Sequence, residues 1–540
     1  MRQLALLFAT SSLLLQSGLP PLVERVNVSV INVDATVFDR SGKPVTNLTK
    51  DDFEIFEDGK PQKIANFYVI ESAVPRVEAS TAAAQPAPVE KRFRRKAILV
   101  VDNNFIDKRR RDVALAEAQK FIDAGFQGGY EWSVATIGAG VHTIQPLTDD
   151  KQKIAAAIDF IRHRGTVPRQ QEVDRGMLSD ETFNRDPGRD SMNEFQRNIT
   201  AKSGLVALAE SAKSVIDACR AYSSIDGKKI IVLVTGGMEI DNRSPLPNDA
   251  SNQPGWMLDP RENRQQAGKI LEAMVHEANA ANFNIYVINA SGPLNPHPMD
   301  VSAHGPEYAG SSGADGFASP HSTQNFDSFP LSLSWQTGGE YLTSNDIGNS
   351  LRRVDLATAN YYSLGYSPGH FEDGKYHTIE VRVKRPGLTV RHRAGYADLS
   401  TEQRIEDALR VSAGPSALPQ QISVEMQMSA AQKENDKLHV QITVITPMKN
   451  ITLLPQDDRN VGRVHIYLSV FDQAGTNVGF EHRRQNLALT AAELEKVGQI
   501  NGNFRYFLNL GLKPGKYRVV VAVRDDITNE VGLAAQDLTL

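Results

Sequence analysis

The fold is decided by residues 96–107, which read KAILVVDNNFID. The residues from Ala97 to Val101 are all apolar, whereas a strand with one solvated face would alternate apolar and polar residues. This run therefore predicts a central, buried parallel strand. It ends at Asp102 and Asn104, and ligands of open α/β sheets bind beyond the carboxyl ends of the strands. These two polar side chains are the first candidates for a functional site.

Strand and helix patterns alternate on the carboxyl side of this run. Further strands are expected at 132–137, 230–234, 285–288 and 340–343, with amphipathic helical patterns near 114–122, 154–161, 205–216 and 262–281. This order predicts a doubly wound, mostly parallel sheet with helices on both faces. Two long polar stretches, 164–198 and 291–326, interrupt the pattern, and we expect them to be disordered or loosely packed.

β patterns flank the α/β region on both sides, so the chain is expected to be multidomain. Alternating strands and an Asp58-Gly59 turn predict an N-terminal β module. A second β segment either completes that module or packs on the α/β domain, and the last segment predicts a C-terminal β-sandwich. The expected divisions are a signal peptide at 1–20, the β module at 22–72, a linker at 73–95, the α/β domain at 96–358, the β extension at 359–398, a linker at 399–418 and the sandwich at 419–540.

Composition narrows the class of protein. The 540 residues exceed one ordinary domain of roughly 150 residues, and a net charge of −5 gives no bulk attraction to nucleic acid or anionic lipid. Residues 1–15 place one basic residue before a short apolar run, which predicts a secretory signal peptide, with a buried first strand or a retained anchor as the alternatives. The single cysteine, Cys219, falls on a helical apolar stripe and is expected to be a buried structural thiol.

The linker at 73–95 lacks any apolar period and ends in a basic cluster. Its Ala, Pro and Ser content predicts a flexible segment. The cluster contains Lys91, Arg92, Arg94, Arg95 and Lys96. We interpret these cations as a solvated hinge, with a polyanion site as the less favoured alternative.

Several separate stretches resemble the von Willebrand factor type A (VWA)-related family typical of Acidobacteria. Residues 37–45 (VFDRSGKPV) and Glu57-Asp58-Gly59 resemble that family's N-terminal β module. Residues 337–341 (TGGEY), 361–366 (YYSLGY) and 384–388 (KRPGL) resemble its trailing signature. The resemblance covers most of residues 26–396, and it implies that the doubly wound sheet is a VWA-like, Rossmann-like α/β core with a metal-ion-dependent adhesion site.

That site, as the resemblance implies it, matches this sequence only in part. The family pattern is Asp-x-Ser-x-Ser after the first strand, a Thr from a second loop and an Asp after the fourth strand. Asp102 matches the first Asp, but Asn104 and Ile106 stand at the two serine positions, and Gly236 stands where the second carboxylate belongs. The loop Thr aligns near Ser203, with Thr200 as the alternative. Glu239 and Asp241 do not have the expected spacing.

The loss of these ligands predicts a degenerate metal site. Mg²⁺ prefers an octahedral set of oxygen donors, and one strong anionic ligand among neutral groups should hold it poorly. We therefore expect no resident cofactor and at most weak Mg²⁺ or Ca²⁺ binding at Asp102 and Asn104. In the competing interpretation Asp102 caps the neighbouring loop and Gly236 only turns the chain.

No complete catalytic set is visible, so we predict that the protein is not an enzyme. His276-Glu277 lacks the second histidine of a zinc-protease helix, and His297, His304 and His321 are irregularly spaced. We expect a secreted, periplasmic or cell-envelope interaction protein of bacterial type that binds a protein or cell-surface polysaccharide, with no nucleic acid and no membrane span after signal removal. The expected ligand-binding rim consists of Asp102, Asn104, Ser203, Thr235 and Glu239. A structural spacer between β modules and a hydrolase with a site hidden from sequence are the alternatives.

Overall fold

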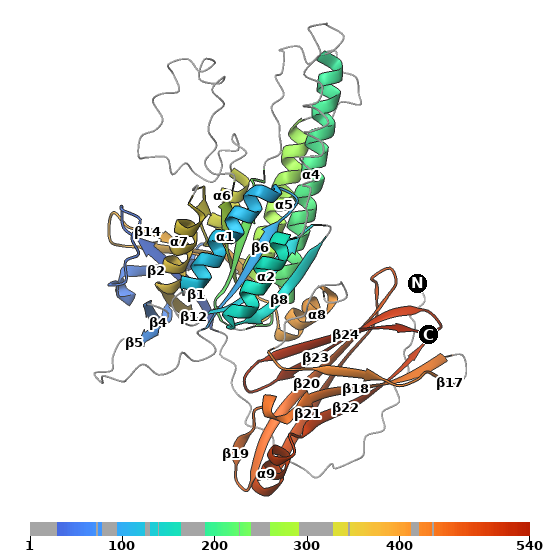
Figure 1. Ribbon diagram of the computed structural model, residues 1–540. Coiled ribbons are helices and arrows are strands. Elements are labelled where there is room, and N and C mark those ends of the chain that lie inside the picture. Colours follow the sequence, from blue (N-terminus) through green and yellow to red (C-terminus); the bar gives the residue numbers. More distant parts are fainter. Residues whose placement is uncertain are drawn as a thin grey trace, which may run out of the picture. The chain divides into compact units, whose positions relative to one another are not determined.

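The computed structural model describes residues 30–71, 74–77, 94–124, 130–138, 140–163, 190–225, 227–238, 260–290, 328–343, 346–411, 421–434 and 437–540 (Figure 1). The expected signal peptide, the insertion at 291–326 and Glu239 lie outside the described residues. The chain divides into two compact units, one made of Val30–Cys219 and Gly227–Asp398, the other containing Arg220–Asp226 and Leu399–Leu540. Within the described residues, no helix has the length and apolar character needed to cross a membrane.

A six-stranded, mostly parallel sheet forms the centre of the first unit. Its order is β11-β10-β9-β6-β7-β8, and only β8 runs antiparallel to its neighbour. The strands are β6 (Arg95–Asp102), β7 (Tyr130–Ile137), β8 (Val141–Thr148), β9 (Lys229–Thr235), β10 (Phe283–Asn289) and β11 (Tyr341–Leu342). Every residue of β6 is buried, as expected for the strand with two parallel neighbours. The edge strand β8 lacks a continuous apolar run and was not predicted.

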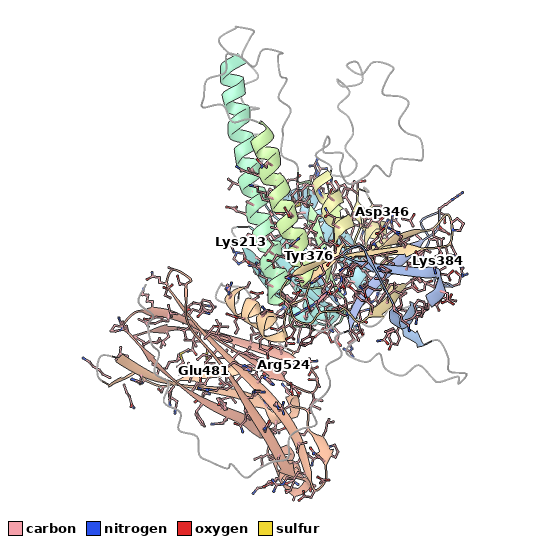
Figure 2. All side chains as sticks on the ribbon, turned by 180° about the vertical axis from the view of Figure 1, so that it is seen from behind. Lys213, Asp346, Tyr376, Lys384, Glu481 and Arg524 are labelled. Carbon is pink, nitrogen blue, oxygen red and sulfur yellow. The ribbon has the colours of Figure 1, made fainter. Side chains whose placement is uncertain are left out.

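Helices cover both faces of this sheet. They are α1 (Lys108–Ala124), α2 (Lys151–His163), α4 (Asp190–Ala221), α5 (Pro260–Ala280), α6 (Ser328–Gln336) and α7 (Ile347–Ala359). Leu99 and Val101 share a core with α1, α2 and α7, which lie in front of the sheet in Figure 1. Figure 2, seen from behind, shows the green helices α4 and α5 on the other face. Helix α4 begins at Asp190, so the last residues of the insertion expected at 164–198 are helical.

Two antiparallel sheets form the β module of the same unit. Their orders are β14-β1-β12-β4-β5 and β15-β13-β2-β3, and side chains from both make one core. The strands are β1 (Ile31–Phe38), β2 (Phe53–Glu57), β3 (Lys60–Gln62), β4 (Ile64–Glu71), β5 (Val74–Val77), β12 (Tyr361–Tyr366), β13 (Tyr376–Val383), β14 (Thr389–Arg391) and β15 (Gly395–Ala397). β12 lies between β1 and β4, so residues more than 290 positions apart are hydrogen-bonded neighbours.

The basic cluster expected to be a solvated hinge is partly buried instead. Arg95 begins β6 with no solvent exposure, and its guanidinium lies 3.6 Å from the ring centroid of Tyr130 and 3.3 Å from a carboxylate oxygen of Asp355. Lys96 is also buried and pairs with Glu131 at 3.5 Å. The hinge interpretation was wrong for these two cations because an aromatic ring and carboxylates from β7 and α7 replace their hydration.

The second unit combines helix α8 with two antiparallel sheets. In one sheet β18 pairs with β16, β17 and β22, and the other contains β19, β20, β21, β23 and β24. The elements are α8 (Thr401–Val411), β16 (Glu425–Met428), β17 (Gln432–Glu434), β18 (Lys437–Pro447), β19 (Leu454–Gln456), β20 (Arg459–Asp472), β21 (Asn477–Thr490), α9 (Ala491–Gln499), β22 (Asn503–Leu512), β23 (Lys516–Asp525) and β24 (Val531–Thr539). Apolar side chains of β18, β20, β22 and β23 share one core, and α8 packs on a second cluster.

Candidate functional site

Asp102 lies at the carboxyl end of β6 and is completely buried. Its side chain is 0 % exposed, and its Oδ1 accepts hydrogen bonds from the Asn104 backbone N–H and from Ser211 Oγ, both at 3.0 Å. Its Oδ2 makes no hydrogen bond to any residue that the structure describes. Burial raises the pKa of Asp102 to about 7, although the two hydrogen bonds act in the opposite direction. The carboxyl group is therefore partly neutral near pH 7.

Ser211 on α4 is the site residue that the sequence did not reveal. Its hydroxyl donates to Asp102 and accepts a hydrogen bond of 3.0 Å from Asn104 Nδ2, so it links both candidate ligands. Ser211 lies three residues after Leu208 and four before Val215, within the buried stripe of the helix. The one signal for it in the sequence was a serine among the apolar positions of the helix, because a buried hydroxyl group needs a hydrogen-bond partner.

The residues around Asp102 do not fit the divalent cation that the family resemblance implies. Ile106 is fully buried in the core and offers no oxygen ligand. A Cβ atom added at Gly236 would lie 2.1 Å from the carbonyl oxygen of Phe105, so the loop after β6 occupies the space that a second carboxylate needs. Among the described residues, no group of three or more carboxylate, histidine or cysteine ligands includes Asp102. A hard cation would find one carboxylate among neutral groups, which is a poor site.

The remaining rim residues are placed as follows. Asn104 and Thr235 are buried, and within the described part of the chain the Thr235 hydroxyl makes no hydrogen bond. Ser203 belongs to α4, but its side chain lies outside the described residues, as does all of Glu239. The structure thus brings Asp102, Asn104 and Thr235 to the carboxyl end of the sheet, but beneath the protein surface. The rim remains a prediction for Ser203 and Glu239.

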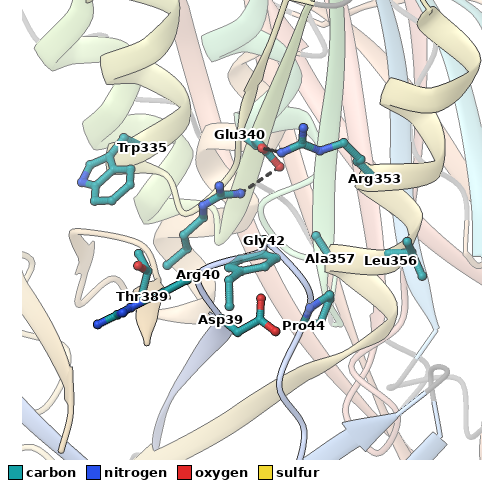
Figure 3. Close-up of a pocket in the computed structure, with 12 residues that line it drawn as sticks. Asp39, Arg40, Gly42, Pro44, Trp335, Glu340, Arg353, Leu356, Ala357 and Thr389 are labelled. Atoms are coloured by element: carbon teal, nitrogen blue, oxygen red, sulfur yellow. Dashed lines mark hydrogen bonds and ion pairs between the residues drawn. The ribbon is translucent and has the colours of Figure 1, made fainter. Parts of the chain in front are cut away.

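A groove of about 630 Å³ lies elsewhere in the same unit, where the β module meets the α/β domain (Figure 3). One part is lined by the end of β1 with the turn that follows it, and by Thr389 and Arg391 of β14. The other part is lined by Trp335 of α6, by Glu340 and by α7. The side chains of Trp335 and Leu356 are 43 % and 46 % exposed, which is high for large apolar residues. The groove therefore combines accessible apolar surface with a charged centre.

Glu340 is that centre. Its carboxylate forms ion pairs with Arg353 of α7 and, at 2.8 Å, with Arg391 of β14, as the dashed lines of Figure 3 show. The Arg391 guanidinium also lies 4.5 Å from the ring centroid of Phe38. A carboxylate held between two arginines fixes the arginine side chains, so they present their remaining N–H donors at low entropic cost. This arrangement could not be predicted from the sequence, because its residues are distant along the chain.

The β module contains a histidine–carboxylate cluster that sequence reasoning also missed. Glu57, His370 and His377 each place one potential ligand atom within 4.8 Å of the others. Glu57 Oε1 accepts hydrogen bonds of 2.7 Å from the hydroxyls of Tyr366 and Tyr396. Burial, and next the hydrogen bond to Glu57, raise the pKa of both tyrosines, so they remain protonated donors.

A second histidine cluster belongs to the C-terminal unit. Glu402, His465, His482 and Arg484 line a cavity of about 360 Å³, and His465 Nδ1 lies 2.9 Å from His482 Nε2. Burial and the neighbouring His465 lower the pKa of His482, so this imidazole is neutral near pH 7. The lining arginine makes the cavity less suited to a cation than the cluster in the β module.

Comparisons with known proteins gave only distant structural similarities. No family model matches the chain, and no curated protein matches it. One similar structure is a von Willebrand factor type A protein from Catenulispora acidiphila, with 10 % identity, a TM-score of 0.23, and coverage of 89 % of this chain and 74 % of the other. An aerotolerance-related membrane protein from Bacteroides fragilis has 10 % identity and a TM-score of 0.22, with 49 % and 98 % covered. A conserved hypothetical protein BatB from Bacteroides thetaiotaomicron has 11 % identity and a TM-score of 0.16, with 36 % and 65 % covered.

Proposed function

We propose that this chain is a non-enzymatic interaction protein that binds a protein partner in the groove between its β module and its α/β domain, without using a metal ion at Asp102. The observation that carries the proposal is the exposed Trp335 and Leu356 beside the Arg353–Glu340–Arg391 ion pairs. Tryptophan and arginine are the residue types most often responsible for binding energy in protein interfaces. We place the protein outside the cytoplasm, secreted or in the cell envelope, on the signal-like residues 1–15.

The strand ends are a weaker place for the same activity. Asp102, Asn104 and Thr235 lie beneath the surface, so a partner has no direct access to them. Without a metal ion at Asp102, a carboxylate of a partner would also find no cation to bind there. Loops that follow β9 and β10 would have to supply all the recognition there. The groove, in contrast, already presents its apolar and charged side chains to solvent.

The charge of the groove indicates the chemistry of the partner. Three arginines line it against two acids: Arg40, Arg353 and Arg391 against Asp39 and Glu340. The excess positive charge favours a segment with acidic side chains, and Trp335 and Leu356 favour apolar ones. We therefore expect an extended peptide segment with one acidic residue beside apolar residues. A polysaccharide partner would instead use Trp335 as a stacking surface and would not require the acid.

Replacement of Trp335 by Ala tests this proposal. Random peptides displayed on phage are selected on the immobilised wild-type protein and their affinities are then measured for each variant. We expect Trp335→Ala to weaken binding at least about 30-fold, which corresponds to the loss of a typical hot-spot residue. Leu331→Ala is the matched control, since Leu331 lies exposed on the same helix but does not line the groove. If the selected peptides bind Trp335→Ala as tightly as wild type, the groove is not the binding site.

A structural spacer is the second candidate, and the burial of Asp102 and Asn104 favours it. A domain whose strand ends are closed and metal-free needs no ligand there, and would serve to connect the β module to a C-terminal β-sandwich. The same selection separates the two functions. A spacer would yield no peptide whose affinity depends on Trp335.

A further inference from the structure

The imidazole ring of His377 lies between two carboxylates in the β module. His377 is the second residue of β13 and is 7 % exposed. Its Nδ1 lies 2.8 Å from Oδ2 of Asp58, which follows β2, and its Nε2 lies 3.2 Å from Oδ1 of Asp373, in the loop at 367–375 between β12 and β13. An ionised carboxylate only accepts hydrogen bonds, so both contacts are hydrogen bonds only when both ring nitrogens carry a proton. The geometry therefore fits the imidazolium form.

The groups that surround His377 favour this cation. They come from β2 and the turn after it, from the loop, and from β15 with the residue that follows it: Glu57, Asp58, His370, Asp373, Lys375, Tyr396 and Asp398. Lys375 is largely exposed and pairs with Asp373 at 3.9 Å, so it compensates the carboxylates weakly. Burial opposes the charge of His377, but the hydrogen bonds to Asp58 and Asp373 outweigh it and raise its pKa.

The ring of His370 lies flat on the ring of His377. Their centroids are 3.8 Å apart and their planes differ by 14°. A metal ion bound to an imidazole nitrogen lies in the plane of the ring, so one ion cannot be held by both of these parallel rings. The stack instead connects the loop to β13, because His370 belongs to the loop and its Nδ1 lies 2.9 Å from Oδ2 of the buried Asp398. Proton binding, and not metal binding, is the chemistry that this arrangement supports.

Loss of the second ring proton breaks the contact with the loop. A neutral imidazole has one N–H and one lone pair, so it keeps only one of its two carboxylate partners. Asp58 is the better-held partner, because its other oxygen accepts hydrogen bonds from the Thr378 N–H at 2.9 Å and from the Thr378 hydroxyl at 3.1 Å. The contact with Asp373 is the longer of the two. The lone pair of neutral His377 therefore faces Asp373 and repels it.

The loop carries its own reporters of this change. The Asp373 N–H donates to Asp398 Oδ2 at 3.2 Å, and the Gly374 N–H donates to the Asp398 carbonyl oxygen at 3.0 Å. Both amides exchange with solvent when this part of the loop leaves the β module. The loop also carries Phe371, whose side chain is 52 % exposed. Opening of the loop thus changes the position of an exposed apolar side chain.

We propose that His377 is a pH-sensitive lock, which holds the loop at 367–375 on the β module when it is protonated and loosens the loop when it is neutral. The sign follows from linkage. The pKa of His377 is higher in the folded protein than its ordinary value of 6.5, so the stabilisation is fully present below pH 6.5 and is lost as the pH rises through the folded value. The lock is independent of the groove and of its partner.

Hydrogen exchange of the Asp373 and Gly374 amides in the full-length protein at pH 6 and pH 9, corrected for intrinsic rates, tests the lock. We expect their protection to fall at least about 3-fold at pH 9, as the loss of a partly exposed ion pair predicts. His377→Gln keeps a side chain with one donor group but cannot become a cation. It should show the low protection of wild type at pH 9 at both pH values.

A second measurement follows His377 itself. In NMR spectra of protein labelled with ¹³C at histidine, the His377 ring should titrate above 6.5, and Asp373→Asn should lower its pKa by removing one carboxylate. Asp373→Asn also replaces His377→Gln if that variant does not fold. His163→Gln, which changes an exposed histidine on α2, is the control and should keep the wild-type pH dependence of the loop.

Three results would overturn the proposal. The first is equal protection of the two loop amides at pH 6 and pH 9 in wild type. The second is a folded His377→Gln variant that keeps the wild-type pH dependence, since another group would then be responsible. The third is a His377 ring that titrates at or below 6.5.

Discussion

Asp102→Asn is expected to stabilise the α/β unit by about 2 kcal/mol at pH 8 and to remove most of its pH dependence between pH 4 and pH 8. Burial raises the pKa of Asp102 from 3.8 to about 7. Between these two values the unfolded chain is ionised while the folded protein keeps its proton, so stability falls as the pH rises from about 4 to about 7 and then levels off. A pKa difference of three units corresponds to about 4 kcal/mol of stability that the wild type loses when Asp102 ionises. The asparagine variant avoids this loss, but its buried amide lacks one hydrogen-bond partner, and we expect this to cost about half as much.

The measurement is hydrogen exchange of the Ala97–Val101 amides at pH 5 and pH 8, corrected for intrinsic rates, because it reports the opening free energy of this sheet separately from the other unit. Asp159→Asn, an exposed carboxylate on α2, is the matched control and should leave protection unchanged. Lower protection of Asp102→Asn at pH 8 would show that the ionised carboxylate stabilises the fold, contrary to this account.

Gly236→Ala is expected to destabilise the same sheet by at least about 3 kcal/mol. The added Cβ would lie 2.1 Å from the Phe105 carbonyl oxygen, and backbone on both sides leaves no flexible side chain to move aside. Gly138→Ala, in the loop after β7, is the control, because an added Cβ there meets nothing within 4 Å and φ is not positive. We expect the control to change the opening free energy by about 0.5 kcal/mol or less. Equal effects of the two substitutions, measured by the same exchange experiment, would mean that the contact with Phe105 does not close the site.

The central sheet was the part of the fold that the sequence predicted best. The apolar run at Ala97–Val101 predicted a buried strand because a strand with parallel neighbours on both sides has no solvated face, and β6 is buried throughout. The helical pattern expected near 154–161 is confirmed by α2, at whose start the Asp150 side chain accepts the Gln152 N–H. Edge strand β8 escaped prediction because it contacts one neighbour only, so its sequence carries no continuous apolar run.

The candidate sites were harder to predict because their residues meet only in three dimensions. Gly236 was recognised as lacking a carboxylate, but the Phe105 carbonyl that fills the space belongs to another loop. Arg95 looked like a solvated cation because its ring and carboxylate partners lie on β7 and α7. The residues of the histidine–carboxylate cluster in the β module are further apart still, since Glu57 precedes His370 by more than 300 residues. A single sequence contains local periodicity, but not the pairing of β2 with β13 that brings these groups together.

We propose that the carboxyl end of the six-stranded sheet binds no metal ion and that a partner binds elsewhere on the protein. Calorimetric titration with Mg²⁺ tests it most directly, with wild type and Asp102→Ala compared under the same conditions. The account predicts no binding at micromolar concentrations for wild type and no difference between the two proteins. Micromolar Mg²⁺ affinity that disappears in Asp102→Ala would contradict it.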